Sequence, residues 1–288
     1  MAQPDALILD FDHSVLPLPG AASIELAPWQ ETIRFGCSPR ALRKLGEPLA
    51  PALARSPRVV FLGSGDYHHV TWLLLQRFCH LERPLRLVVF DNHPDNMRYP
   101  FGIHCGSWVW WASRLPFVAG IDVLGITSRD VERARAWENH WGNLRSGKVR
   151  YWCVGRELSW MRYLGRQHSR SFATVAELLA GYGEESKHYA EPVYLSIDKD
   201  VLSPADVQTN WDQGVMRFDE LLGAVAALKP RLVAADVTGE VSLYRYQSRF
   251  KRFLSGLDGQ HAPSPQDLAQ WQAQHQTINQ RLLAALMA

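Results

Sequence analysis

The sequence lacks several features that would place it in well-known classes of protein. None of its apolar runs approaches the roughly 20 residues that a helix needs to cross a bilayer. Its 31 basic and 29 acidic residues nearly cancel to a net charge of +2, and neither sign gathers in an arm or tail. Such a charge pattern argues against nucleic acid and membrane surfaces as partners. The expected partner is therefore a small molecule or a peptide.

Cysteine is also scarce and has no paired spacing. The four cysteines are far apart, at Cys37, Cys79, Cys105 and Cys153. This spacing predicts neither a zinc ribbon nor a disulfide framework, and reduced thiols fit best. The opening MAQPDALILDFDHS has no basic segment, and acids interrupt its apolar run after four residues, so no signal peptide is expected. Together these features predict a cytoplasmic protein.

What the sequence does contain is a series of short apolar runs rich in Val, Ile and Leu. Seven of them have the length and composition of strands buried on both faces. They are residues 6–11, 58–63, 85–90, 121–126, 149–154, 192–197 and 231–236. Stretches with helical spacing lie between several of the runs, at 69–81, 129–141, 174–182 and 217–228. This alternation predicts an α/β protein with three α/β/α layers and a mostly parallel, doubly wound sheet.

One domain spanning residues 1–288 is expected, because the chain shows no internal repeat, low-complexity tract or convincing linker. Residues 257–288 are predicted to form a C-terminal extension of a loop and a helix. The helix is expected at roughly 265–287, after a capping pattern of Ser264 and Asp267. We expect it to be a docking element or a contact within a homo-oligomer.

Acids and histidines directly follow three of the apolar runs. In a doubly wound sheet, ligands bind beyond the carboxyl ends of the strands, so these positions are the ones to inspect. Asp91, His93 and Asp95 follow the run at 85–90 at alternate positions, which lets their side chains converge on one side. Asp198 and Asp200 follow the run at 192–197 with the same spacing.

The run at 58–63 is followed by SGDYHH, in which glycines allow a tight turn and two histidines are available. Each motif alone is also typical of helix capping or a solvated turn. Pooled, the three motifs provide five carboxylates and two or three histidines, more negative charge than a buried pocket holds without cations. Two divalent ions would balance it. Carboxylate and imidazole ligands without thiolate suit Mn²⁺, with Fe²⁺, Co²⁺, Ni²⁺ or Zn²⁺ as alternatives.

The three motifs together resemble those of the ureohydrolases, the arginase and agmatinase family. That family's motifs read roughly Gly-Gly-Asp-His-Ser, Asp-Ala-His-x-Asp and Ser-x-Asp-x-Asp. GSGDYHHVT (63–71) is similar to the first with one residue inserted, DNHPD (91–95) to the second and SIDKD (196–200) to the third. The resemblance covers most of residues 58–240. It implies an arginase-like fold and a hydrolase that cleaves a C–N bond of a linear amidine.

The resemblance implies a binuclear manganese site. The residues that it assigns as ligands are His68, Asp91, His93, Asp95, Asp198 and Asp200. Asp91 and Asp198 would bridge both ions, with His68 and Asp95 completing one and His93 and Asp200 the other. HHVT resembles the family's His-Ser-Ile-Thr, which favours His68 over His69. The inserted Tyr67 leaves open whether His68 reaches the metal.

The resemblance also implies a mechanism, in which hydroxide held between the two ions attacks the guanidinium carbon and yields urea and an amine. Asp95 would orient the hydroxide. His104, in the sequence GIHCG, matches a histidine that shuttles protons in the family, and it would protonate the leaving amine. The expected substrate is arginine-like, agmatine-like or an arginine within a peptide.

The residues that would hold this substrate depart from the family's pattern. The family places an acid after a later strand to hold the guanidinium, and Asp236 and Glu240 are the two candidates. The loop at 201–214 differs from the family's substrate loop and introduces Trp211 and Asp212. Trp211 is expected to stack on a guanidinium plane or to pack within the loop.

Other classes stay open at this point. LILDFDHSVL (7–16) resembles the first motif of the haloacid-dehalogenase phosphatases, with Asp10 as nucleophile, Asp12 as acid/base and Lys199 as the later lysine. The phosphatase interpretation leaves DNHPD unexplained. Under the ureohydrolase interpretation, Asp10, Asp12 and His13 are expected near the same cleft, where they contact substrate or cap a turn. A single-zinc deacetylase needs one Asp-x-His pair and a distant Asp. A non-enzymatic metal-binding protein would show the same motifs.

Overall fold

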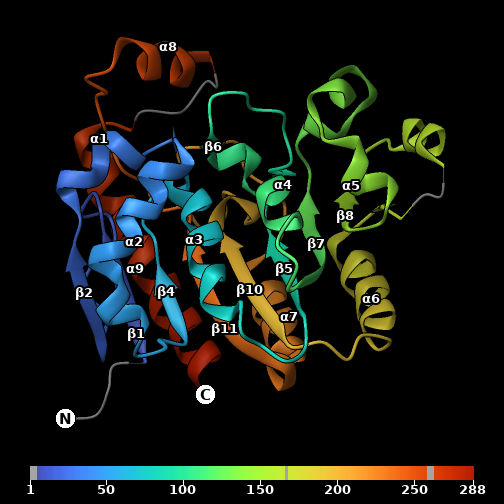
Figure 1. The fold of residues 1–288 in the computed structure, drawn as a ribbon, viewed down its shortest axis with the longest axis horizontal. Coiled ribbons are helices and arrows are strands. Elements are labelled where there is room, and N and C mark those ends of the chain that lie inside the picture. Colours follow the sequence, from blue (N-terminus) through green and yellow to red (C-terminus); the bar gives the residue numbers. More distant parts are fainter. Residues whose placement is uncertain (1–4, 166–167, 258–262) are drawn as a thin grey trace.

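The computed structural model describes residues 5–165, 168–257 and 263–288. Its centre is a nine-stranded sheet in the order β2-β1-β4-β11-β10-β5-β7-β8-β9 (Figure 1). All neighbouring pairs in this sheet are parallel. The strands are β1 (Ala6–Asp10), β2 (Ala21–Glu25), β4 (Val59–Phe61), β5 (Leu85–Phe90), β7 (Val118–Ile126), β8 (Val149–Val154), β9 (Arg170–Phe172), β10 (Val193–Asp198) and β11 (Leu232–Thr238). A separate antiparallel pair joins β3 (Gly36–Cys37) to β6 (Ile103–His104).

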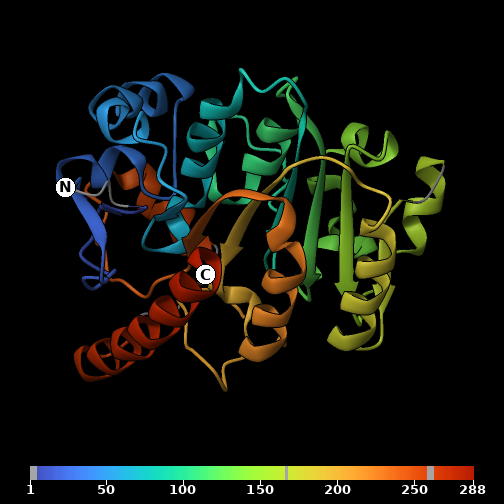
Figure 2. The ribbon, with the colours of Figure 1, turned by 90° about the horizontal axis from the view of Figure 1, so that it is seen from below.

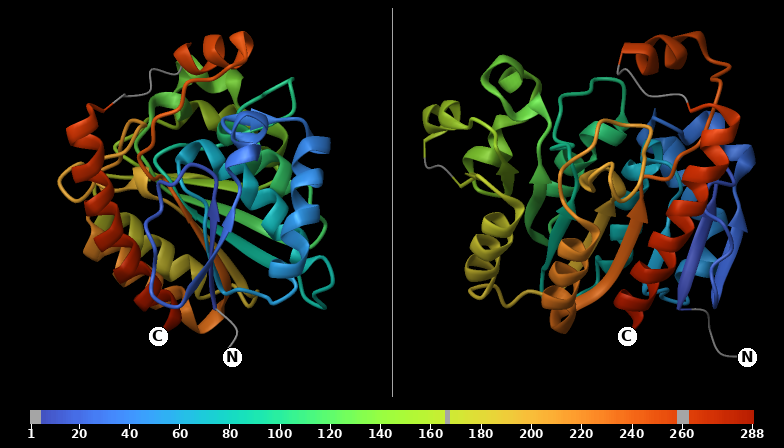
Figure 3. Two further views of the ribbon diagram at one scale, coloured as in Figure 1. Left: turned by 90° about the vertical axis from the view of Figure 1, so that its left-hand side faces the viewer. Right: turned by 180° about the vertical axis from the view of Figure 1, so that it is seen from behind.

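Helices cover both faces of the sheet, as Figure 2 and the edge-on view in Figure 3 show. On one face lie α2 (Pro39–Leu53), α3 (Thr71–Leu75), α4 (Trp108–Ser113) and α5 (Trp141–Arg145). On the other lie α6 (Val175–Ser186), α7 (Phe218–Leu228) and α9 (Pro265–Met287). The remaining α-helices are α1 (Gln30–Ile33) and α8 (Arg249–Leu257). The predicted three-layer α/β/α architecture is thus confirmed.

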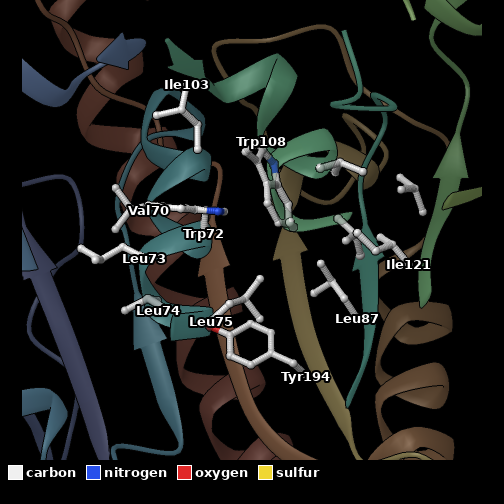
Figure 4. Close-up of a cluster of buried hydrophobic side chains, with 14 of the residues drawn as sticks. Val70, Trp72, Leu73, Leu74, Leu75, Leu87, Ile103, Trp108, Ile121 and Tyr194 are labelled. Atoms are coloured by element: carbon white, nitrogen blue, oxygen red, sulfur yellow. The ribbon is translucent and has the colours of Figure 1, made fainter. Parts of the chain in front are cut away.

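Alternation along β5 explains how one strand serves two cores. Leu87 and Val89 face the helix layer that contains α3 and α4, while Val88 and Phe90 face the layer that contains α7. Figure 4 shows the first of these cores, where Leu87 lies near Trp108. A strand buried on both faces needs apolar residues at every position, and this is why the run was recognisable in the sequence.

All seven apolar runs form strands, with ends that move by up to three residues. The two edge strands, β2 and β9, were not predicted, because their positions are half-exposed and carry few large apolar residues. The expected helical stretch at 129–141 forms mainly 3₁₀ turns, η5 (Arg129–Val131) and η6 (Arg133–Glu138). Helix α2 was not predicted; Pro48 and Pro51 interrupt its pattern, although Leu42, Leu45 and Leu49 form its buried stripe.

The C-terminal helix forms at Pro265–Met287, as expected, and Ser264 caps it by accepting a hydrogen bond from the Asp267 N–H at 3.2 Å. The helix packs beside α7, on the same face of the sheet (Figure 3), through Ile278, Leu282 and Leu286. None of the described helices is long and apolar enough to cross a membrane.

Candidate metal centre

The sheet brings the second and third motifs together at one edge. Strands β5 and β10 are parallel neighbours, and Phe90 is in register with Ile197. Asp91 and Asp198 therefore end the two strands side by side, although 107 positions separate them in the chain. The first motif follows β4 as a 3₁₀ turn, η2 (Gly65–Val70), which carries His68 into the same region.

One group of donors surrounds the His68 imidazole. Its Nδ1 lies 3.1 Å from Asp95 Oδ2 and 3.3 Å from both Asp91 Oδ2 and Asp198 Oδ2. Burial alone would lower the pKa of His68, but hydrogen bonding to these three carboxylates outweighs it and raises the pKa well above 6.5. The three carboxylates therefore form a site that favours positive charge.

The opposite nitrogen of His68 fixes which atom faces the carboxylates. Ser196 Oγ donates to Asp236 Oδ1 at 2.7 Å, so it must accept from His68 Nε2, which lies 2.9 Å away. The Nε2 position therefore carries a hydrogen, and Nδ1 is the atom left for a metal. A histidine ligand oriented through its second nitrogen is the usual arrangement at protein metal sites.

A second donor group shares Asp91 with the first. His93 Nδ1 lies 2.9 Å from Asp200 Oδ2 and 3.6 Å from Asp91 Oδ1. His93 Nε2 lies 2.8 Å from Asp212 Oδ1, which holds that nitrogen and leaves Nδ1 facing the cluster. Asp91 thus presents one oxygen to each group, as a bridging ligand would. Two sets of donor atoms lie within 4.8 Å of one another: those of His68, Asp91 and Asp198, and those of Asp91, His93 and Asp200.

Asp95 is held in an uncommon conformation. Its φ of 47° is left-handed, a region that Asp adopts more readily than most residues. Its Oδ2 accepts a hydrogen bond from Trp108 Nε1 at 2.7 Å. Burial, together with the charge of Asp91, raises the pKa of Asp95 to about 7. The residue therefore holds a desolvated carboxylate against the cluster, and this arrangement favours a cation.

The donor set fits a pair of divalent cations. Oxygen and imidazole nitrogen are the only donor types in the two groups. Asp91 Oδ2 is buried and lies 3.3 Å from His68 Nδ1, so this oxygen and this nitrogen are close enough to share one cation. Gly239 (φ 89°) lets the backbone approach the Asp198 carboxylate where a Cβ would collide with it. Buried carboxylates in this number require positive charge.

The structure also separates the two adjacent histidines. His69 lies outside both donor groups, and burial lowers its pKa well below 6.5. The inserted Tyr67 points away, with its ring stacked on Phe11 at 4.4 Å between centroids. The 3₁₀ turn η2 therefore contains the inserted residue, and His68 still lies beside Asp91, Asp95 and Asp198.

His104 lines the same pocket as the donor groups. Its ring lies 4.6 Å from that of Tyr99, which is stacked on it, and 4.5 Å from the edge of Phe35. Nδ1 accepts a hydrogen bond from the Gly106 N–H at 3.0 Å, so the ring hydrogen is on Nε2. Burial lowers the pKa of His104 to about 4, and the imidazole is therefore neutral at pH 7.

The expected substrate residues do not share one location. Trp211 lines the pocket, with its ring 6.1 Å from that of His93. Asp212 is 67% exposed and binds His93. Asp236, by contrast, is fully buried and accepts hydrogen bonds from Tyr194 and Ser196 at 2.6 and 2.7 Å. The structure therefore places Asp236 outside the pocket lining, where it accepts a hydrogen bond from Ser196.

Glu240 is also removed from the pocket. It is buried in an ion pair with Lys199, and the Asn279 side-chain amide donates to its Oε1 at 2.6 Å. His275 Nδ1 lies 3.2 Å from the other oxygen, Oε2. The structure therefore places Glu240, the second expected substrate acid, outside the pocket lining, because Lys199 pairs with its carboxylate inside the protein. Its partner Lys199 could not have been identified from sequence, since no motif joins positions 199 and 240.

The first strand ends in a separate network. Asp10 binds His13 at 2.9 Å, and Asp12 accepts from Arg34 Nη1 at 3.2 Å and from Ser242 Oγ at 2.7 Å. Neither acid lines the pocket. Together with the burial of Lys199, this separation leaves the phosphatase motif without an assembled site.

Comparison with known proteins is decisive for the family. The model of the Arginase family matches residues 17–244, well over half of the chain. The chain belongs to the arginase family. A dehalogenase-type phosphatase is thereby excluded as its family. An uncharacterized protein of Thermotoga maritima is 27% identical over 244 residues, covering 83% of this chain and 81% of that protein.

Solved structures of the arginase type share the fold at low identity. The proclavaminate amidino hydrolase of Streptomyces clavuligerus matches with a TM-score of 0.53 and 17% identity, over 85% of this chain and 87% of that one. A formiminoglutamase variant of Trypanosoma cruzi, solved with Mn²⁺, gives 0.53 and 14%, over 84% and 88%. The arginase of Bacillus caldovelox gives 0.52 and 16%, over 85% and 93%. This chain is therefore a divergent family member.

Proposed function

We propose that this protein is a binuclear manganese hydrolase that cleaves a C–N bond of a guanidino compound to give urea and an amine. One observation carries the proposal: two groups of buried donors meet at the ends of β5 and β10 and share Asp91. Membership of the arginase family supports a hydrolase of this class. The similar structures are those of an arginase, an amidino hydrolase and a formiminoglutamase, and they support the range of substrates to be tested.

The six motif residues would hold the metals. We propose that His68 and Asp95 would help to hold one ion and His93 and Asp200 the other, with Asp91 and Asp198 shared between them. When bound, a pair of divalent cations supplies Lewis-acid activation of a water molecule. Mn²⁺ is favoured by the carboxylate and imidazole donors.

The residues beside the donors would position substrate and protons. The Asp95 carboxylate, held by Trp108, would accept a hydrogen bond from the attacking water. His104 Nε2 carries the ring hydrogen, and we propose that this atom donates toward the leaving amine. Trp211 lines the pocket near His93, and Asp212 contacts His93 Nε2 at 2.8 Å. We propose that Trp211 contacts the substrate and that Asp212 orients His93.

The test is metal content and urea release on the same protein. Protein purified with Mn²⁺ supplied is analysed by mass spectrometry beside Asp198→Ala and a matched surface control, Asp219→Ala, whose side chain is 85% exposed. Agmatine, arginine and an arginine peptide are then assayed for urea. We expect about two ions per chain and urea from one of these compounds, with both lost only in Asp198→Ala. One ion would indicate a deacetylase-like site, and no ion would indicate a non-enzymatic protein.

The organisation of the chain is also part of the proposal. We propose one domain over residues 1–288, with 257–288 as a C-terminal extension, supported by the packing of α9 into the core beneath the sheet. A cytoplasmic location and a homo-oligomer stay predictions.

A further inference from the structure

The resemblance to the ureohydrolases implies that an acid after a late strand holds the substrate's guanidinium. In this chain one of the two candidates, Glu240, is already paired with a cationic side chain, that of Lys199. Lys199 and Glu240 form an ion pair whose side chains are 0% and 1% exposed. Lys199 Nζ also donates to Asn279 Oδ1 at 3.0 Å, and Asn279 comes from α9. Glu240 is thus enclosed by side chains from two other segments of the chain, the residues after β10 and helix α9.

A substrate cannot use Glu240 without breaking this enclosed pair. Separating Lys199 from Glu240 would leave a buried charge without a partner, which costs more free energy than one new ionic contact returns. Asp236 is equally engaged, with Tyr194 and Ser196. Neither residue lines the pocket. Recognition of a cationic substrate therefore requires an acid elsewhere.

Three charged residues other than the metal donors line the pocket: Asp130, Arg135 and Glu138. Asp130 lies on the 3₁₀ turn η5, and Arg135 and Glu138 lie on η6. Asp130 accepts from Arg135 Nη1 at 2.6 Å, so these two balance each other. Within the described part of the chain, no side chain or backbone group donates a hydrogen bond to the half-buried Glu138 carboxylate. Burial raises the pKa of Glu138, and the nearby Arg135 charge offsets only part of this rise.

We propose that Glu138 is the acid that binds the cationic end of the substrate, and that Lys199 takes the place of a substrate cation at Glu240. The inference rests on the proposed function and narrows it to substrates that carry a guanidinium or ammonium group. The Glu138 carboxylate gains a charged donor that the protein itself does not provide. Trp211, which lines the same pocket, offers its ring face to the same cation.

The experiment compares Glu138→Gln with Glu184→Gln in the Mn²⁺-loaded protein. Glu184 is 75% exposed on α6 and provides the same chemical change at a remote position. The probe is agmatine, whose KM and kcat are measured by urea release, and whose binding is measured by calorimetry where turnover is absent. We expect Glu138→Gln to raise KM or Kd at least about tenfold, because a charge-assisted hydrogen bond is lost. Manganese content should stay unchanged, and Glu138→Asp should restore part of the affinity.

The outcomes separate this inference from the proposed function. Equal KM values for the wild type and Glu138→Gln, in an enzyme that releases urea, would overturn the role of Glu138 and leave the hydrolase intact. A loss of manganese in Glu138→Gln would also overturn it, because the residue would then act on the metal centre. A wild-type protein that holds two ions and neither binds nor cleaves agmatine, arginine or an arginine peptide would overturn both proposals.

Discussion

Replacement of Lys199 by Met tests whether the buried pair with Glu240 is as enclosed as the structure shows. Met has a similar length and removes the charge, which leaves a carboxylate that is 1% exposed beside Asn279 and His275. Removing one partner of a buried pair costs about 3–5 kcal/mol. The Asn279 amide still donates to Glu240, so we expect the lower end, about 3 kcal/mol of unfolding free energy.

The assay is urea denaturation of Lys199→Met, Glu240→Gln and the double variant, all in EDTA. The chelator is needed because Lys199 lies between Asp198 and Asp200, and metal binding to the native state would add its own stabilisation. The double variant has no buried charge at either position. We therefore expect it to be more stable than Lys199→Met, with a coupling free energy of about 2–3 kcal/mol between the two sites.

Two results would refute this reasoning. Lys199→Met with the stability of the wild type would mean that Glu240 reaches solvent or is protonated at little cost. Strictly additive effects in the double variant would mean that the two side chains do not interact, and Glu240 would then be free to meet a substrate.

Two further predictions concern the groups around the cluster. Ser196→Ala removes the hydroxyl between His68 and Asp236. We expect the affinity for Mn²⁺, measured by titration calorimetry, to fall by about 10–100-fold. An unchanged affinity would contradict the role of Ser196 in orienting His68. His104 has a pKa lowered from 6.5 to about 4, so the unfolded chain binds more protons between these values. Its contribution, about 3 kcal/mol, is present above pH 6.5 and lost as pH falls to 4. In His104→Asn, the side-chain oxygen can still accept from the Gly106 N–H. We expect the unfolding free energy of this variant, measured in EDTA, to rise less steeply between pH 4 and 6.5. Parallel curves for the variant and the wild type would contradict the lowered pKa of His104.

The sequence by itself determined the interior strands and the residues at their ends. A strand buried on both faces needs a continuous apolar run, and polar residues that directly follow such a run must lie at the carboxyl edge of a parallel sheet. Asp91, His93 and Asp95 could be placed for this reason, as could Asp198 and Asp200. This signal is local, because each of these two motifs, DNHPD and SIDKD, spans five residues.

Only the tertiary structure decided which acids are available to a substrate. Asp236 and Glu240 lie at the end of a predicted strand, yet Tyr194 holds one and Lys199 the other. Glu138, on a 3₁₀ turn expected as helix, reaches the pocket instead. Whether a carboxylate is free depends on partners from distant segments, and periodicity along one segment carries no information about them.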